Sequence, residues 1–116
     1  MASELNEEEL EPKRAREVIA SEGAQLLDLR GDDDWVEARI AGAVRADDDI
    51  ESAVESLDED RPVVVVCADG KSSGVLAYDL RERGFQAATI KRGMKGWTQK
   101  GLPTLPREAE EFKGPG

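Results

Sequence analysis

Four consecutive valines at positions 63–66 constrain the fold of this chain more than any other feature. Pro62 precedes them, and the polar sequence CADGKS (67–72) follows. A strand with one face in water alternates apolar and polar residues, whereas an unbroken β-branched run suits a strand that is covered on both faces. Such strands lie at the centre of parallel sheets, so the run predicts a central strand of an α/β protein.

Helical and extended patterns alternate along the rest of the chain. Helices are expected over 11–21, 32–38, 49–57, 73–83 and 93–97, and further strands over 24–29, 41–46 and 85–90. We expect Asp32 and Ser73 to cap the helices that they begin. In the helix over 73–83, Val75, Leu76, Ala77, Tyr78 and Leu80 fit a helical period. The alternation predicts an α/β fold with a mostly parallel sheet.

The charge of the chain argues against some partners. It has 26 acidic and 16 basic residues, a net charge of −10. A surface this negative repels phosphate backbones, and no basic stripe with interleaved aromatic residues is visible, so we expect no nucleic-acid partner. The acidic runs are interpreted as solvated surface. No apolar run approaches the roughly 20 residues of a membrane span, so no membrane partner is expected.

The length of 116 residues fits one domain with one hydrophobic core. We expect a flexible N-terminal segment over 1–9, one domain over 10–106 and a flexible, charged C-terminal tail over 107–116. The single cysteine cannot form an internal disulfide, and the charged N-terminus lacks the apolar core of a signal peptide. These features favour a reduced, cytoplasmic environment.

The only cysteine, Cys67, stands where the valine strand ends and a loop begins. In open parallel sheets, ligands bind beyond the carboxyl ends of the strands. Gly70 and its small neighbours allow backbone N–H groups to curl inward at the start of a helix, which makes an anion site. Lys71 adds a positive charge nearby. These features predict a reactive thiol that is held as a thiolate, rather than a buried apolar side chain.

The chain contains no histidine, which narrows the chemistry available to this thiol. Cys–His and Ser–His nucleophile pairs and zinc sites with histidine ligands are excluded. A thiolate without a base or a metal does not readily activate water or hydrolyse an amide. It can attack a soft electrophile such as sulfur, and the resulting persulfide would be held by the same N–H groups. Such chemistry needs no cofactor and no metal.

An ordered set of short motifs runs along the chain: Asp28-Leu29-Arg30, Asp34-Trp35, Ala38-Arg39-Ile40 followed by Ala41-Gly42-Ala43, the loop residues Cys67, Gly70, Ser72 and Ser73, and then Ala77, Leu80, Gly84-Phe85, Gly93, Trp97 and Gly101-Leu102-Pro103. In this order and spacing they resemble the single-domain rhodaneses, the thiosulfate:sulfurtransferase family, over about residues 10–104. The resemblance implies a rhodanese-like α/β fold, with a central, mostly parallel five-stranded sheet and helices on both faces.

The resemblance also implies a reaction. Cys67 would attack the outer sulfur of thiosulfate or a related anionic donor, carry the sulfur as a persulfide, and pass it to cyanide, a thiol or a carrier protein. The expected substrate-binding residues are Ala68, Asp69, Gly70, Lys71, Ser72, Ser73 and Arg30.

The residues alone favour other roles for some of these side chains. They favour a structural ion pair of Arg30 with Asp28 or Asp34, and an Asp69 carboxylate that points away from the sulfur. Trp35 and Trp97 are interpreted as packing residues.

Three positions depart from the family pattern. Arg39 stands in place of a usual histidine, and Arg92 in place of the first glycine of a Gly-Gly pair. Many members carry arginine where this chain has Ser72, although a subgroup of small members carries serine there. Without that arginine, Lys71 and the loop backbone are expected to bind the anionic donor. The departures concern the identity of the donor more than the chemistry.

Two other functions stay open at this point. Cysteine phosphatases and arsenate reductases share this general loop but use Cys-x5-Arg, whereas here that position is Ser73 and the next arginine is Arg81. The second alternative is a non-catalytic rhodanese-homology module with a regulatory or interaction role. Such modules often lack the cysteine, so the presence of Cys67 argues against it.

Overall fold

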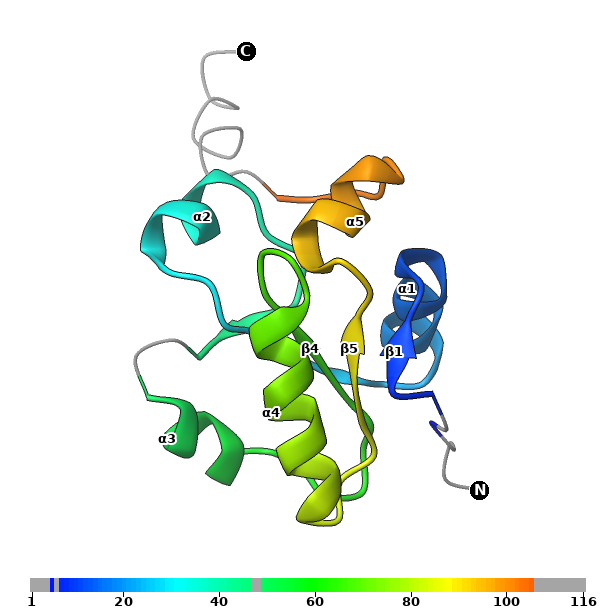
Figure 1. The fold of residues 1–116 in the computed structure, drawn as a ribbon, viewed down its shortest axis with the longest axis vertical. Helices are drawn as coiled ribbons and strands as arrows, with labels where there is room; N and C mark the ends of the chain where they lie inside the picture. The colour runs from blue at the N-terminus through cyan, green and yellow to red at the C-terminus, as the bar shows by residue number, and fades with distance from the viewer. Residues whose placement is uncertain (1–4, 6, 47–48, 106–116) are drawn as a thin grey trace.

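A computed structural model describes residues 5, 7–46 and 49–105 (Figure 1). Strands and helices alternate in the order β1 (Glu9–Leu10), α1 (Pro12–Ser21), β2 (Gln25–Asp28), α2 (Asp32–Glu37), β3 (Val44–Arg45), α3 (Ile50–Glu55), β4 (Val63–Val66), α4 (Lys71–Glu82), β5 (Ala87–Ile90) and α5 (Gly93–Gln99). The strands form one sheet in the order β1-β5-β4-β2-β3, and every pairing in it is parallel. The predicted five-stranded parallel sheet is confirmed.

The four valines of β4 lie in the middle of this sheet and are completely buried. Because successive side chains of a strand point to opposite faces, Val64 and Val66 pack in a cluster with residues of α1 and α5. Val63 and Val65 pack on the other face with residues of α3 and α4. Each buried valine stabilises the fold by about 1.5 to 3 kcal/mol relative to an exposed one. Helices therefore cover both faces of the sheet, as predicted.

No pattern in the sequence predicts β1. Glu9 falls in the segment expected to be flexible, whereas the structure pairs Glu9 and Leu10 with β5. Leu5 is also buried, and its N–H donates a 2.8 Å hydrogen bond to Gln86 Oε1. A two-residue strand is too short to produce an alternating pattern, which is why the sequence gives no signal for it. Residues 1–4 and 6 and the predicted tail over 107–116 lie outside the described residues, so the domain limits stay a prediction.

The predicted cap of α2 and part of the predicted apolar face of α4 are wrong. Gly31, not Asp32, is the N-cap of α2, and Asp32 lies in its first turn. In α4, Val75 and Tyr78 are 72% and 59% exposed rather than part of the apolar face. Consecutive helical residues are rotated by about 100°, so a run of neighbouring apolar residues cannot all face the core.

Among the described residues, no helix combines the length and the apolar character needed to cross a membrane.

The first turn of α5 packs directly against the loop that follows β4. The N–H groups of Met94 and Lys95 donate to the carbonyl oxygens of Cys67 and Ala68, at 2.8 and 3.1 Å. Gly93 has φ 58°, and a Cβ atom on it would lie 2.2 Å from the Cys67 oxygen. Only glycine allows the two segments to come this close. Trp97 anchors the same helix: it is 2% exposed, which confirms its predicted packing role, and its Nε1–H donates to Pro103 O at 2.9 Å.

Arg92 precedes this glycine and has φ 64°, the only positive φ of a non-glycine residue in the described part of the chain. We expect Arg92→Gly to raise the free energy of unfolding by about 1 kcal/mol. The left-handed conformation costs a residue with a Cβ atom about 1 to 2 kcal/mol, and the greater freedom of glycine in the unfolded chain offsets part of the gain. Denaturant unfolding measures the change. Arg92→Ala is the matched control, because it removes the side chain and keeps the strain; an equal gain in both variants would contradict the backbone explanation.

Candidate active site

Cys67 follows β4 directly, at the carboxyl edge of the sheet, and is 6% exposed. Its Sγ accepts hydrogen bonds from the backbone N–H groups of Gly70, at 3.1 Å, and Ser73, at 3.3 Å. The Ser73 hydroxyl oxygen lies 3.2 Å from the same sulfur. The inward-facing amides that the sequence predicts are therefore present, and they point at the sulfur itself. Hydrogen bonds of this kind stabilise a thiolate relative to a thiol.

Gly70 makes this arrangement possible. Its φ of 96° lies in the left-handed region that favours glycine, and it is the N-cap of α4. The prediction that Ser73 caps this helix is wrong, because α4 begins at Lys71 and Ser73 is its third residue. Ser73 is completely buried, and its hydroxyl oxygen accepts a hydrogen bond from the Cys67 thiol instead of binding a free N–H of the helix. The dipole of α4 adds about 0.3 to 1 kcal/mol in favour of negative charge at this end.

The contacts with α5 orient the other peptide groups of the loop. Because the Cys67 and Ala68 carbonyls accept hydrogen bonds from α5, the N–H groups of Ala68 and Asp69 in these trans peptides point away from α5. No motif in the sequence connects Gly93 and Met94 with the thiol. A clue was available, since a glycine after a strand permits close approach of two backbones.

Asp69 is exposed, but one of its carboxylate oxygens turns toward the loop. Oδ1 accepts the Lys71 N–H at 3.0 Å and lies 3.8 Å from Cys67 Sγ. This differs from the expectation that the carboxylate points away from the sulfur. The bond from the Lys71 N–H, together with the positive charge of Lys71, lowers the pKa of Asp69 from its ordinary value. The carboxylate therefore stabilises the turn of the loop, and its negative charge lies close to the sulfur.

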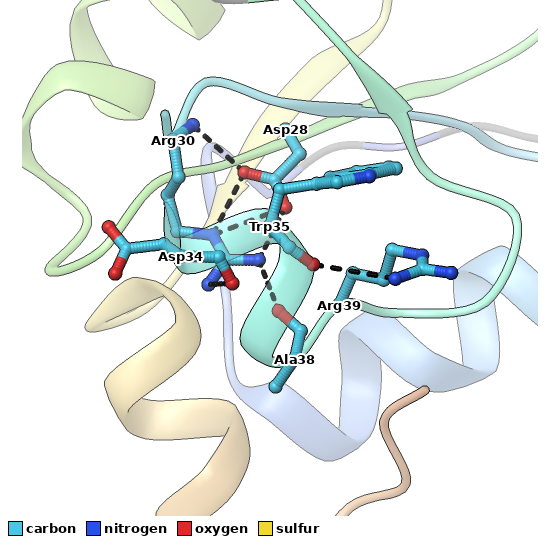
Figure 2. Close-up of polar contacts among 6 residues, drawn as sticks. All are labelled: Asp28, Arg30, Asp34, Trp35, Ala38 and Arg39. Atoms are coloured by element: carbon cyan, nitrogen blue, oxygen red, sulfur yellow. Dashed lines mark hydrogen bonds and ion pairs between the residues drawn. The ribbon is translucent and has the colours of Figure 1, made fainter. Parts of the chain in front are cut away.

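Arg30 forms a buried ion pair with Asp28 (Figure 2). The Asp28 side chain is completely buried, and Arg30 Nε and Nη2 reach its two oxygens at 3.0 and 2.8 Å. Arg30 Nη2 also donates to Ala38 O at 2.7 Å, which ties the end of β2 to the segment after α2. These contacts support the structural ion pair that the residues alone favour. A contact of Arg30 with substrate stays a prediction.

Figure 2 also shows the surroundings of Trp35, which is half-buried at the end of the same short helix. The Arg39 guanidinium lies 5.3 Å from the centre of the Trp35 ring and donates to Trp35 O at 3.4 Å. Arg39, one of the departures from the family pattern, therefore stabilises the α2 segment through a cation–π contact. The predicted packing role of Trp35 is consistent with this position.

A hollow of about 320 Å³ lies beside the loop that follows β4. Ala68, the residue after Cys67 in the chain, is one of the residues that line it. The other lining residues come from the Arg30 segment and from one face of α5; they are Arg30, Asp34, Ala38, Met94, Lys95 and Thr98. Lys71 and Ser72 are exposed at the start of α4, on the same loop. Met94, Lys95 and Thr98 are not among the predicted site residues, because only the packing of α5 brings them to this place.

Comparison with known proteins agrees with this geometry. Residues 11–100 match the family described as the rhodanese-like domain. The chain belongs to this family. Its relatives include the thiosulfate sulfurtransferase GlpE of Actinobacillus pleuropneumoniae serotype 3 (strain JL03), which is 33% identical over 97 residues, 82% of this chain and 90% of GlpE. A tRNA sulfurtransferase of Pyrobaculum aerophilum is 36% identical over 74 residues, 63% of this chain and 15% of that protein.

A solved structure has the same fold. A rhodanese-related protein from Thermoplasma volcanium superposes with a TM-score of 0.77 at 20% identity, over 85% of this chain and 98% of that one. The family match and the sequence relatives place this rhodanese-like chain among the sulfurtransferases, as its motifs predict.

The buried ion pair leads to a prediction about stability. We expect Arg30→Ala to lower the free energy of unfolding by about 3 to 5 kcal/mol, because the Asp28 carboxylate would remain buried without its partner. Denaturant unfolding followed by circular dichroism measures the loss. Arg83→Ala is the control: its ion pairs with Asp79 and Glu51 are exposed, so its loss is expected to stay below about 1 kcal/mol. A loss for Arg30→Ala as small as that of the control would argue against a structural role.

Proposed function

We propose that this protein transfers sulfane sulfur from thiosulfate, or a related anion, to a thiophilic acceptor through a persulfide on Cys67. The observation that carries the proposal is the set of hydrogen bonds to the sulfur, in which the Gly70 and Ser73 N–H groups lie 3.1 and 3.3 Å from Sγ. The relatives named thiosulfate sulfurtransferase support the choice of donor. The lone cysteine, which has no disulfide partner in the chain, is compatible with a reduced compartment such as the cytoplasm.

The reaction has two displacement steps. The Cys67 thiolate attacks the outer sulfur of thiosulfate; a new S–S bond forms, the S–S bond of the donor breaks, and sulfite leaves with the bonding electrons. The acceptor, a thiolate or cyanide, then attacks the outer sulfur of the persulfide and regenerates the Cys67 thiolate. Neither step needs water to be activated or a leaving group to be protonated, which suits a chain without histidine.

Local charge supports an anionic donor. Residues 84–105 contain Lys91, Arg92, Lys95 and Lys100 and no acidic residue, in a chain whose net charge is −10. This segment includes α5, which packs against the Cys67 loop and contributes Lys95 to the hollow beside it. A basic region within an acidic surface raises the local concentration of anions where the thiol lies. Lys95 therefore partly replaces the charge that Ser72 does not supply.

The alternatives fit the site less well. A phosphatase of this loop type needs a guanidinium six residues after the cysteine, whereas Ser73 occupies that position, with its N–H donating to the sulfur and its hydroxyl oxygen 3.2 Å from it. A non-catalytic module needs no thiol with hydrogen-bond donors arranged around it. The serine at position 73 argues against a phosphatase, and the donors around the sulfur argue against a non-catalytic module.

Intact-mass measurement tests the persulfide directly. We expect the full chain to gain the mass of one sulfur atom after exposure to thiosulfate without reductant, and to lose it on addition of cyanide with release of thiocyanate. Cys67→Ser is the control and should gain nothing, because the nucleophile is absent. The proposal fails if thiosulfate, mercaptopyruvate and persulfide donors all leave the mass unchanged.

Steady-state kinetics test the role of Lys95. Lys95→Gln should raise the KM for thiosulfate about fivefold at low ionic strength and leave kcat within about twofold, because a surface charge near a dianion contributes about 1 kcal/mol. Lys100→Gln removes the same charge at the other end of α5, outside the hollow, and should have a smaller effect. Equal effects of the two variants would show that only overall charge matters.

A further inference from the structure

A second buried hydroxyl lies behind the Cys67–Ser73 pair. Thr89, on β5, is 5% exposed, and its Oγ1 shares a short hydrogen bond with Ser73 Oγ. Ser73 Oγ in turn lies 3.2 Å from Cys67 Sγ. Side chains from β5, from α4 and from the end of β4 therefore form a continuous buried chain that ends at the sulfur. The reaction described above uses the backbone N–H donors and assigns no role to Thr89.

The hydrogen-bond partners determine which way the protons of this chain point. Each hydroxyl has one proton to donate, and the only hydrogen bond of Thr89 Oγ1 within the described structure is to Ser73 Oγ. If Ser73 donated to Thr89, the Thr89 proton would have no acceptor, and a buried polar group without a partner costs about 1 to 3 kcal/mol. If Thr89 donates to Ser73, the Ser73 proton is free to bind the sulfur. The second arrangement leaves both hydroxyls satisfied.

We propose that Thr89 is a positioning residue for sulfur transfer, which donates its proton to Ser73 Oγ and thereby directs the Ser73 hydroxyl proton at Cys67 Sγ. As a thiol, Cys67 donates to Ser73 Oγ at 3.2 Å. The thiolate has no proton to give, so in that form the sulfur has three donors, namely the N–H groups of Gly70 and Ser73 and the Ser73 hydroxyl. Hydrogen bonds to a charged acceptor are stronger than those to a neutral one, so the third donor favours the thiolate and its anionic persulfide. The statement that Thr89 serves sulfur transfer rests on the proposed function. The direction of the hydrogen bond from Thr89 to Ser73 does not depend on that function.

The position of Asp69 explains why a third donor matters. Its Oδ1 lies 3.8 Å from the sulfur, so its negative charge disfavours the thiolate. Basic side chains near the loop are exposed Lys71 on α4 and Lys95 on α5, and solvent screens their charges. The Thr89–Ser73 pair is buried, and its hydrogen bonds act at full strength in a dry environment.

Alkylation of Cys67 by iodoacetamide tests the inference without any sulfur donor. The quantity measured is the alkylation rate at neutral pH divided by the rate at about pH 10, where cysteine thiols are ionised. Thr89→Val has the shape of threonine without the hydroxyl. It should lower this ratio about fivefold, because a Ser73 hydroxyl that Thr89 no longer fixes can turn to a backbone carbonyl of its own helix, and the thiolate then loses one donor. Thr89→Ser keeps the hydroxyl and should stay within about twofold of the wild type. Thr89→Ala serves as a second hydroxyl-free variant if the valine is not accommodated.

A double-mutant cycle shows whether Thr89 acts through Ser73. Ser73→Ala alone should lower the ratio, and adding Thr89→Val to it should cause no further loss, because the hydroxyl that Thr89 orients is gone. An unchanged ratio in both hydroxyl-free Thr89 variants, or losses that simply add, would overturn the proposal. A purely structural role would lower the stability of Thr89→Val and leave the ratio unchanged.

The same proteins separate the two proposals. If the wild type accepts sulfur but the ratio does not respond to Thr89, the role of Thr89 is refuted and the proposed function stands. If the ratio responds but the wild type accepts no sulfur from any donor, the proposed function is refuted and the hydrogen-bond chain stands.

Discussion

The close contact between α5 and the loop after β4 is the constraint on which the site depends. Gly93 lies so near the Cys67 carbonyl that a Cβ atom would be 2.2 Å from its oxygen, and the next two N–H groups bind the Cys67 and Ala68 carbonyls. With these carbonyls occupied, the loop turns through Gly70 and presents N–H groups to the sulfur. The strained φ of Arg92 is part of the cost of this contact.

The chemistry of the site follows from hydrogen bonding rather than from an acid–base residue. A chain without histidine has to stabilise a thiolate by other means, and here Gly70 and Ser73 supply the donors. Asp69 opposes them from 3.8 Å, while Lys95 of α5 lines the hollow beside the loop. Sulfur transfer suits a site with hydrogen-bond donors and no acid–base residue, because its leaving group, sulfite, and its intermediate, the persulfide, are both stable as anions.

Sequence reasoning succeeded where the signal was local and failed where it depended on distant residues. The valines of β4 indicated a central parallel strand, and the position of Cys67 before Gly70 indicated inward-facing amides. Ser73 was expected to cap α4, because serine prefers that position, but Gly70 occupies it and Ser73 binds the sulfur. The contact of Thr89 with Ser73 could not be predicted, since the two residues lie 16 positions apart along the chain and meet only because α4 packs against β5.

The sequence by itself determined the type of fold and the family and indicated Cys67 as the candidate nucleophile, because β-branched runs, glycine positions and a lone cysteine carry physical meaning within a few residues. Only the tertiary structure decided which groups surround that nucleophile. Arg30 is engaged by Asp28, Lys95 reaches the hollow from α5, and Thr89 reaches Ser73 from β5. These contacts join residues of different elements, and their geometry depends on how the sheet pairs and how the helices pack on it.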